Sequence, residues 1–199
     1  MTASATVLGI VGSVSDSSKT RSAVEIALAA AADDPAVETD LLHLADYDLV
    51  TADGRQLDQY EGDTAEALER IVEADAYIVG TPVYRGSYSG VLKNLLDMVP
   101  RGMWQADVAP FEDAAVGLVA TGATDHHYLA IDQELRPLFA FFGAHTVGGG
   151  VYASDEDFKD REVTTGELRD RLETLGAATV ELSRAIEESD ALGSLGPQF

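Results

Sequence analysis

Residues 5–32 read ATVLGIVGSVSDSSKTRSAVEIALAAAA, and this segment predicts a strand, a loop and a helix in succession. Residues 5–11 are apolar and rich in β-branched side chains, and Gly12 ends the run, which is typical of a buried strand. A serine-rich loop follows, and residues 22–32 are dominated by alanine, leucine and isoleucine, which favour a helix. The chain therefore begins with the strand-loop-helix unit from which parallel sheets are built.

The same alternation of short apolar runs and helical patterns continues along the chain, without an internal repeat or a low-complexity linker. Thr64 is a suitable N-cap for the second helix, and Pro100 closes the third. Further strands are predicted over 37–44, 76–80, 114–120 and the glycine-rich 144–151, and further helices over 65–74, 90–99, 126–142 (interrupted by Pro137) and 165–188.

Five strands separated by helices predict an α/β fold with a doubly wound parallel sheet in the order 2-1-3-4-5 and helices on both faces. In such sheets a ligand binds beyond the carboxyl ends of the strands, where the winding reverses between strands one and three. We therefore expect the loops after Gly12, Gly80 and Ala120 to form one site. Residues 1–190 are expected to make a single domain, and residues 191–199 a flexible tail.

The composition excludes several classes of protein. With 199 residues, 46% of them apolar, the chain has the size and hydrophobicity of one folded domain. It has no cysteine, which excludes disulfides, thiolate metal sites and a cysteine nucleophile. The formal net charge is -22, from 13 basic and 35 acidic residues. Nucleic acids and anionic membranes are therefore not expected as partners, because both bind basic surfaces.

The acidic residues are spread over the whole chain, and the lysines are limited to Lys19, Lys93 and Lys159. Repulsion among carboxylates is screened in concentrated salt, where the Debye length is about 3 Å at 1 M. We interpret this surface as a salt-adapted (halophilic) one; an ordinary acidic cytosolic protein is the alternative. Residues 1–13 lack the basic region of a signal peptide, and the apolar run 7–11 is too short for a membrane span, so a cytoplasmic location is expected.

The first of the three loops, residues 12–22, suits a monophosphate. Its hydroxyls and backbone amides precede a helix N-terminus, where unpaired N–H groups and the helix dipole favour an anion. It contains neither GxGxxG nor GxxxxGK[ST], so a dinucleotide or a nucleoside triphosphate is not indicated at this loop. The alternative is that the serines only cap the helix and solvate a turn.

The second loop, residues 81–90, suits a planar ring. Pro82 stiffens the exit from the third strand, and Tyr84 and Tyr88 offer aromatic walls. Its small residues let backbone amides approach a ring closely. The third loop, residues 121–127, is a small-residue turn of the same kind. Because the topology brings the three loops together, their coincidence is more informative than any one of them.

On these motifs the chain resembles the NADPH-dependent FMN reductases, a family of flavodoxin-like proteins, and especially the small reductases that supply reduced flavin to alkanesulfonate monooxygenases. The resemblance covers about residues 7–186. It implies FMN and either NADPH or NADH as cofactors, and a flavin-dependent monooxygenase or a quinone-like acceptor as the recipient of electrons. The matching motifs are Gly12-Ser13 with Ser18 and Thr20, GTPVY at 80–84 with Ser87, KNLLD at 93–97, and ATGAT at 120–124 with His127.

The resemblance also implies a role for each loop. The first loop holds the FMN phosphate through Ser13, Ser18 and Thr20, and the other two flank the isoalloxazine. The flavin supplies the hydride chemistry, so no catalytic acid or base is expected. Backbone N–H groups near residues 84–87 are expected to stabilise the negative charge of the reduced ring. The expected cofactor-binding residues are Ser13, Ser15, Ser18, Lys19, Thr20, Pro82, Val83, Tyr84, Arg85, Ser87, Thr121, Gly122 and Ala123.

This chain departs from the family pattern at two positions. Many members carry an arginine near the phosphate where this chain has Ser15, so Lys19, Arg21 or backbone amides must meet the phosphate charge. In the sulfonate-linked reductases a tyrosine deforms the fourth helix, and Gln133 falls near that position. The resemblance further implies a homodimer or homotetramer, with residues 90–99 and 126–142 at the interface.

Two other functions fit the same fold. A flavodoxin-type electron carrier would hold FMN permanently and reduce a partner protein, and a flavin-binding regulator would bind FMN without turnover. A serine hydrolase is not supported, because the GxSxG motif is absent. No metal site is expected either, since the adjacent His126 and His127 would point about 100° apart on a helix and have no third ligand at suitable spacing.

Overall fold

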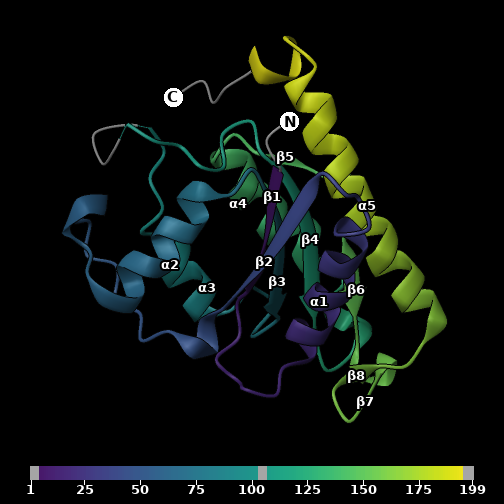
Figure 1. The fold of residues 1–199 in the computed structure, drawn as a ribbon. Coiled ribbons are helices and arrows are strands. Elements are labelled where there is room, and N and C mark those ends of the chain that lie inside the picture. The colour runs from purple at the N-terminus through teal and green to yellow at the C-terminus, as the bar shows by residue number, and fades with distance from the viewer. Residues whose placement is uncertain (1–4, 103–106, 195–199) are drawn as a thin grey trace.

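The computed structural model describes residues 5–102 and 107–194. Its main element is a parallel sheet in the order β2-β1-β3-β4-β5, with β6 also pairing with β4 (Figure 1). The predicted α/β, flavodoxin-like sheet and its strand order are confirmed. The strands are β1 Ala5–Val11, β2 Val37–His43, β3 Ala76–Pro82, β4 Ala115–Thr121, β5 His145–Thr146 and β6 Val151–Ala153.

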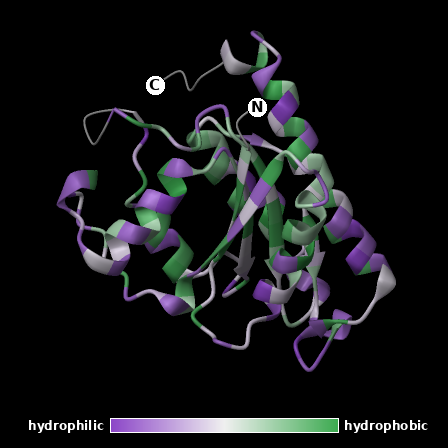
Figure 2. Cartoon of the chain, in the orientation of Figure 1, coloured by the Kyte–Doolittle hydropathy of each residue, from purple (hydrophilic) through white to green (hydrophobic). Residues whose placement is uncertain are grey.

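Side chains of each central strand alternate between two hydrophobic clusters, as the two-residue period of a strand requires. In β1, Leu8 and Ile10 belong to one cluster, and Val7 and Val11 belong to the other. Both faces of the sheet are therefore buried, which explains why its strands read as continuous apolar runs. Figure 2 shows the hydrophobic strands at the centre and hydrophilic residues on the outer helices.

Helices cover both faces of the sheet. Helices α1 and α5 pack together on one face, and α2, α3 and α4 lie on the other (Figure 1). The α1–α5 crossing is close, because a Cβ at Gly176 would collide with the carbonyl oxygen of Ala27. The helices are α1 Lys19–Ala31, α2 Gly62–Glu73, α3 Gly90–Leu96, α4 Arg136–Phe141 and α5 Gly166–Glu187.

The prediction of a continuous fifth strand over 144–151 is wrong. Two short strands, β5 and β6, pair with separate parts of β4. Between these two pairings β4 advances three residues, from Val116 to Val119, whereas the edge chain advances five, from Thr146 to Val151. The surplus falls on the glycine run 148–150, which has no side chains to hold a regular strand in place.

The prediction of a long helix over 126–142, interrupted only at Pro137, is also wrong. A 3-10 turn over Asp125–His127 comes first, a π-helical segment over Ile131–Leu135 follows, and only then does α4 begin. Pro137 cannot donate a hydrogen bond to the turn before it, and a widened π turn next to it avoids that loss. The helix is therefore deformed around Gln133 without a tyrosine at that position.

The segment between β6 and α5 contains an antiparallel hairpin that the sequence did not indicate. Its strands are β7 Phe158–Lys159 and β8 Glu162–Val163. Beyond α5, Leu192–Ser194 forms a 3-10 turn, and residues 195–199 of the expected tail lie outside the described residues. Within 5–102 and 107–194, no helix has the length and hydropathy of a membrane span.

Candidate functional site

A cavity of about 340 Å³, here called the crevice, opens at the carboxyl ends of β1, β3 and β4. All three predicted loops contribute to it, as the strand order requires. The structure thus brings together eleven of the thirteen expected residues, and it leaves Arg85 and Ser87 outside the lining. The expected residues that line the crevice are Ser13, Ser15, Ser18, Lys19, Thr20, Pro82, Val83, Tyr84, Thr121, Gly122 and Ala123.

The first loop uses its serines partly for its own shape. Ser18 is the N-cap of α1, and its hydroxyl accepts a hydrogen bond from the Arg21 amide at 3.3 Å. Ser13 is buried and accepts from the Ser15 amide, also at 3.3 Å. The capping role considered for these serines is therefore present, but it engages a single amide of the first helical turn, that of Arg21. The preceding amides of that turn have no acceptor within the helix and suit an anion in the crevice.

A buried hydrogen-bond network joins the first loop to the second. The Ser89 hydroxyl donates to the carbonyl oxygen of Gly12 at 2.6 Å and accepts from the Leu92 amide as the N-cap of α3. The Ser89 amide donates to the Thr81 hydroxyl at 3.0 Å. Ser89 therefore fixes the spacing between the loops that follow β1 and β3, although it does not line the crevice itself.

The third loop is joined to the other two by similar contacts. The hydroxyls of Thr20 and Thr121 lie 2.7 Å apart in a buried hydrogen bond, and the Val83 amide donates to the Thr121 carbonyl oxygen at 2.7 Å. The Tyr152 hydroxyl donates to the Thr124 carbonyl oxygen at 2.6 Å. Burial, with Asp125 and Asp155 as smaller influences, raises the pKa of Tyr152, so the phenol stays protonated for this bond.

The second loop ends in a tight turn at the rim of the crevice. Tyr84 and Ser87 exchange two backbone hydrogen bonds, at 2.9 and 3.2 Å, and the turn between them has positive φ at Arg85 (57°) and Gly86 (87°). The amides of Tyr84 and Ser87 are therefore engaged within the turn. The Ser87 hydroxyl donates to a carboxylate oxygen of Glu134 at 2.8 Å, which explains why Ser87 lies outside the lining.

Three residues line the crevice that sequence reasoning missed: Ser17, Asp155 and Arg161. Ser17 belongs to the serine-rich loop and could have been inferred from it. Asp155 and Arg161 come from the segment after β6, and no sequence signal placed that segment beside the first loop. Asp155 forms an ion pair with Lys19, with 2.6 Å between Oδ1 and Nζ.

The other cation considered for a phosphate is directed elsewhere. Arg21 does not line the crevice and forms an ion pair with Glu25, one helical turn further along α1, at 2.8 Å. That pair raises the pKa of Arg21 through the hydrogen bond to Glu25. Of the two basic residues expected near a phosphate, only Lys19 thus reaches the crevice.

His43 is a buried titratable residue close to the first loop. It ends β2 and lies beside Val11 of β1 in the sheet. The side chain is 1% exposed, and neither ring nitrogen has a hydrogen-bond partner within the described residues. Burial lowers the pKa of His43, against smaller opposing effects of nearby carboxylates such as Asp46. The ring is therefore neutral at neutral pH.

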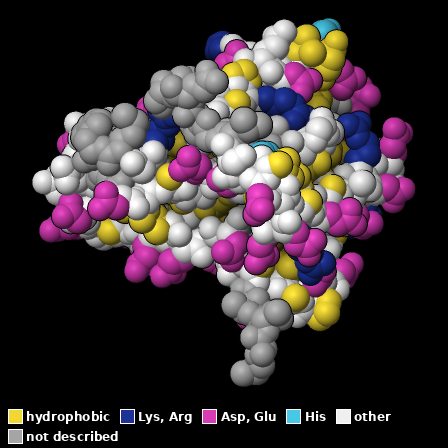
Figure 3. Space-filling model, turned by 90° about the horizontal axis from the view of Figure 1, so that it is seen from above, with side chains coloured by type: hydrophobic (Ala, Val, Ile, Leu, Met, Phe, Trp, Pro, Cys, Tyr) yellow, Lys and Arg dark blue, Asp and Glu magenta, His cyan; other side chains and the backbone are white. Residues whose placement is uncertain are grey.

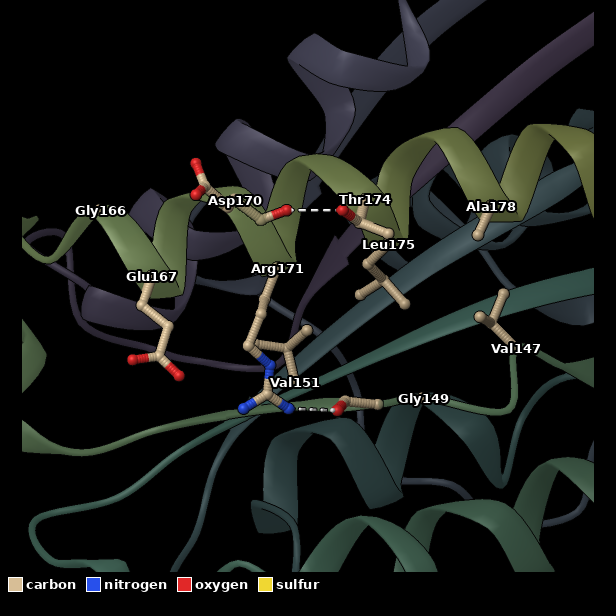
Figure 4. Close-up of a pocket in the computed structure, with 11 residues that line it drawn as sticks. Val147, Gly149, Val151, Gly166, Glu167, Asp170, Arg171, Thr174, Leu175 and Ala178 are labelled. Carbon is tan, nitrogen blue, oxygen red and sulfur yellow. Dashed lines mark hydrogen bonds between the residues drawn. The ribbon is translucent and has the colours of Figure 1, made fainter.

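A larger cavity of about 670 Å³, here called the edge groove, lies between the edge of the sheet and α5 (Figure 4). Its lining includes the apolar side chains of Val147, Val151, Leu175 and Ala178, and none of the thirteen expected residues lines it. Arg171 of α5 donates to the Gly150 carbonyl oxygen of the sheet edge at 3.3 Å, and the Thr174 hydroxyl donates to the Asp170 carbonyl oxygen within α5. The larger cavity is therefore not the one on which the three predicted loops converge.

Comparisons with known proteins agree with this geometry. The family model described as NADPH-dependent FMN reductase matches residues 5–159. An NAD(P)H-dependent FAD/FMN reductase of Geobacillus thermodenitrificans is 37% identical over 150 residues, which are 74% of this chain and 77% of that protein. The NADH-dependent FMN reductase SfnF of Pseudomonas fluorescens is 38% identical over 136 residues, 68% of this chain and 69% of its own length.

A solved structure supports the same assignment over nearly the whole chain. The apo form of the NADH:FMN oxidoreductase EmoB superposes with a TM-score of 0.75 and 25% identity, and the match covers 98% of this chain and 97% of that one. Fold, crevice and sequence therefore agree, and this chain belongs to the NADPH-dependent FMN reductase family.

Proposed function

We propose that this protein is an NAD(P)H-dependent FMN reductase that binds FMN in the crevice and reduces it with a nicotinamide cofactor. The observation that carries the proposal is the convergence of the loops after β1, β3 and β4 on one cavity. At one end of that cavity lie the hydroxyls and the N-terminus of α1, which suit a phosphate. At the other lie Pro82, Val83 and Gly122, which suit a planar ring.

The chain's own groups then bind and orient the flavin. Ser13, Ser18 and Thr20 hold the phosphate end, and Val83 and Thr121, which are hydrogen-bonded to one another, support the ring end. The amides of Arg85 and Gly86 make no hydrogen bond within the described residues. They belong to the rim turn outside the crevice lining, next to Tyr84, which lines it, and we expect them to face the electron-rich edge of the ring. FMN, when bound, supplies the hydride chemistry.

Two measurements on the same sample of protein test this proposal. Titration with FMN should quench flavin fluorescence, and NADPH or NADH should then be oxidised steadily in air with FMN as the only added flavin. A flavodoxin-type carrier would bind FMN yet oxidise almost no nicotinamide without a partner reductase. A flavin-binding regulator would bind FMN and show no turnover with any acceptor, a quinone included.

The acidic surface supports a further proposal, adaptation to concentrated salt. Acidic side chains are scattered across the face seen in Figure 3, and few basic ones interrupt them. With a net charge of -22, the folded chain repels itself in dilute buffer, and salt screens this repulsion. The free energy of unfolding should therefore rise between 0.1 and about 2 M KCl. A fall over that range would exclude salt adaptation.

Exposed apolar side chains near the crevice support assembly into a homodimer or homotetramer. Tyr84 and Tyr128 are each 60% exposed, and Leu129 is 40% exposed. A second copy that covers Tyr128 and Leu129 would use the segment expected at an interface from the sequence. Light scattering in concentrated salt should give a multiple of 21.1 kDa. A cytoplasmic location and a monooxygenase as the recipient of reduced flavin complete the proposal.

A further inference from the structure

Arg161 lies at the tip of the β7–β8 hairpin and lines the crevice together with the serines of the first loop. It comes after residue 159, where the match to the family model ends. The hairpin and the loop after β1 lie at the same end of the sheet (Figure 1). Arg161 therefore adds a cation to the phosphate end of the crevice from a segment just beyond the residues that the family model matches.

The backbone of Arg161 has a conformation that arginine rarely adopts. The two residues at the tip of the hairpin, Asp160 and Arg161, have φ of 51° and 72°. Two-residue turns of this kind strongly prefer glycine at the second position, and the other such turn at the crevice has Gly86 there. At Arg161 a strained arginine replaces the residue that the turn favours, which points to a use for its side chain.

The rest of the hairpin is fixed firmly enough to hold Arg161 in place. The carboxylate of Asp157 accepts hydrogen bonds from the Ser154 amide at 2.9 Å and the Thr165 hydroxyl at 3.1 Å. Val163 is buried in the cluster between the sheet, α1 and α5, and Phe158 packs against that cluster. The tip is thus held by both strands of the hairpin, while Arg161 itself is exposed to solvent.

The charges around the crevice leave Arg161 available for an anion. Lys19 is paired with Asp155, and Arg21 is paired with Glu25. Arg161 forms no ion pair within 5–102 and 107–194. Serine hydroxyls and helix amides carry no full charge, so a phosphate dianion in the crevice lacks an unpaired cation unless Arg161 supplies it.

We propose that the Arg161 guanidinium binds the 5′-phosphate of FMN and supplies the charge that Ser15 cannot. This inference rests on the proposed function, because it assumes that FMN occupies the crevice. Asp155 competes with the phosphate for Lys19, so Lys19 contributes fully only when the phosphate displaces that carboxylate. Arg161 needs no such exchange.

The test compares FMN with riboflavin, which has the same ring and no phosphate. Dissociation constants are measured by fluorescence quenching at the lowest salt concentration at which circular dichroism shows a folded protein. Arg161→Gln should weaken FMN binding about tenfold, the lower end of what a charge-assisted hydrogen bond contributes, and leave riboflavin binding unchanged. The salt dependence of FMN binding should also decrease.

Two further variants separate binding from folding. Arg161→Gly should weaken FMN binding equally, and it should raise the Tm of the flavin-free protein by about 2–4 °C because glycine relieves the positive φ. Arg169→Gln removes the same charge from α5, where Arg169 lines a different surface pocket, and should leave FMN binding unchanged.

The outcomes distinguish this inference from the proposed function. If Arg161→Gln binds FMN with wild-type affinity, the inference alone is overturned; a raised KM for NADPH in that variant would then assign the cation to the nicotinamide cofactor. An equal loss of affinity for FMN and for riboflavin also overturns the inference, because it would indicate damage to the ring end. Failure of the wild-type protein to bind either flavin overturns the proposed function, and the inference with it.

Discussion

The crevice and the edge groove are both cavities beside the same sheet, but they arise for different reasons. The edge groove is about 670 Å³ and the crevice about 340 Å³. The groove lies between α5 and the edge of the sheet, where Gly149 and Gly150 are among its lining residues. The crevice exists because three strands end together and their loops must turn away from one another.

This difference shows why volume is a weak guide to a functional site. In the groove, the Thr174 hydroxyl bonds to the Asp170 carbonyl oxygen of its own helix, and a single bond, from Arg171 to Gly150, joins α5 to the sheet edge among the described residues. In the crevice, hydroxyls and amides from separate elements are joined to one another by Ser89, Thr20 and Thr121. Substitutions at the crevice should therefore change both stability and flavin binding, and those at the groove neither or only stability.

The largest effect is expected from removing a hydroxyl. Ser89→Ala deprives the buried Gly12 carbonyl oxygen of its donor and α3 of its N-cap. An unsatisfied buried acceptor costs about 1–3 kcal/mol and a lost cap about 1 kcal/mol. The free energy of unfolding should fall by about 2–4 kcal/mol, and FMN binding should weaken because the first two loops lose their connection. Urea denaturation and flavin fluorescence measure the two effects.

The matched substitution in the groove is Thr174→Ala, which also removes a hydroxyl. The Thr174 hydroxyl bonds only within its own helix, and alanine is the better helix former. Its stability should stay within about 0.5 kcal/mol of the wild type, with unchanged FMN binding. If Thr174→Ala weakened FMN binding as much as Ser89→Ala, the distinction between the two cavities would be lost.

A smaller effect is expected from adding one methyl group to each cavity. A Cβ at Gly122 would collide with the Tyr152 hydroxyl, which is held by its bond to Thr124, whereas a Cβ at Gly149 would meet no atom within 4 Å. Gly122→Ala should therefore lower the free energy of unfolding by about 1–3 kcal/mol and weaken FMN binding. Gly149→Ala should raise the free energy of unfolding by about 0.4–1 kcal/mol, because the unfolded chain loses conformational freedom.

Thermal and urea denaturation of both variants, with FMN titration of each, give the comparison. Opposite signs of the stability change are the expected result. Equal destabilisation by the two substitutions would mean that the groove is packed as tightly as the crevice, and the contrast between the two cavities would be lost.

Features that depend on neighbouring residues could be predicted from the sequence, and features that depend on distant contacts could not. The unit of β1, the first loop and α1 is determined by neighbouring residues, and its strand and loop were predicted correctly. The right-handed crossover rule limits the possible strand orders to a few, of which 2-1-3-4-5 is a common one. Together they placed eleven expected residues on one cavity, from Ser13 to Ala123. Their role in binding FMN stays a prediction.

The features that were missed depend on distant contacts. Val147 and Val151 flank the glycine run, and the segment reads as one strand, but only the pairing of Thr146 and Val151 with β4 shows that the run bulges out. The π-helical segment reflects packing of Ile131 and Leu135 in the core as well as Pro137. The β7–β8 hairpin has Asp160-Arg161 where a glycine would have indicated a turn. The arginine that makes the turn hard to predict is also the residue that supplies the cation.

The smallest effect concerns a buried ionisable group on the crevice side, where His43 adjoins the first loop. The groove has none, since its ionisable lining residues Glu167, Asp170 and Arg171 are exposed. Burial lowers the pKa of His43 in the folded protein below its ordinary value of 6.5. As the pH falls through 6.5, the unfolded chain binds a proton that the folded chain does not, so the free energy of unfolding must fall.

This loss grows by at most about 1.4 kcal/mol per pH unit and stops once the pH falls below the folded pKa. His43→Leu removes the titrating ring, so the variant should lose less stability than the wild type between pH 7.5 and about 5.5, where other groups titrate equally in both. Urea denaturation at fixed ionic strength measures the difference. Parallel curves for the two proteins would mean that water reaches the imidazole in the folded state, and the region behind the first loop would then be as open as the groove.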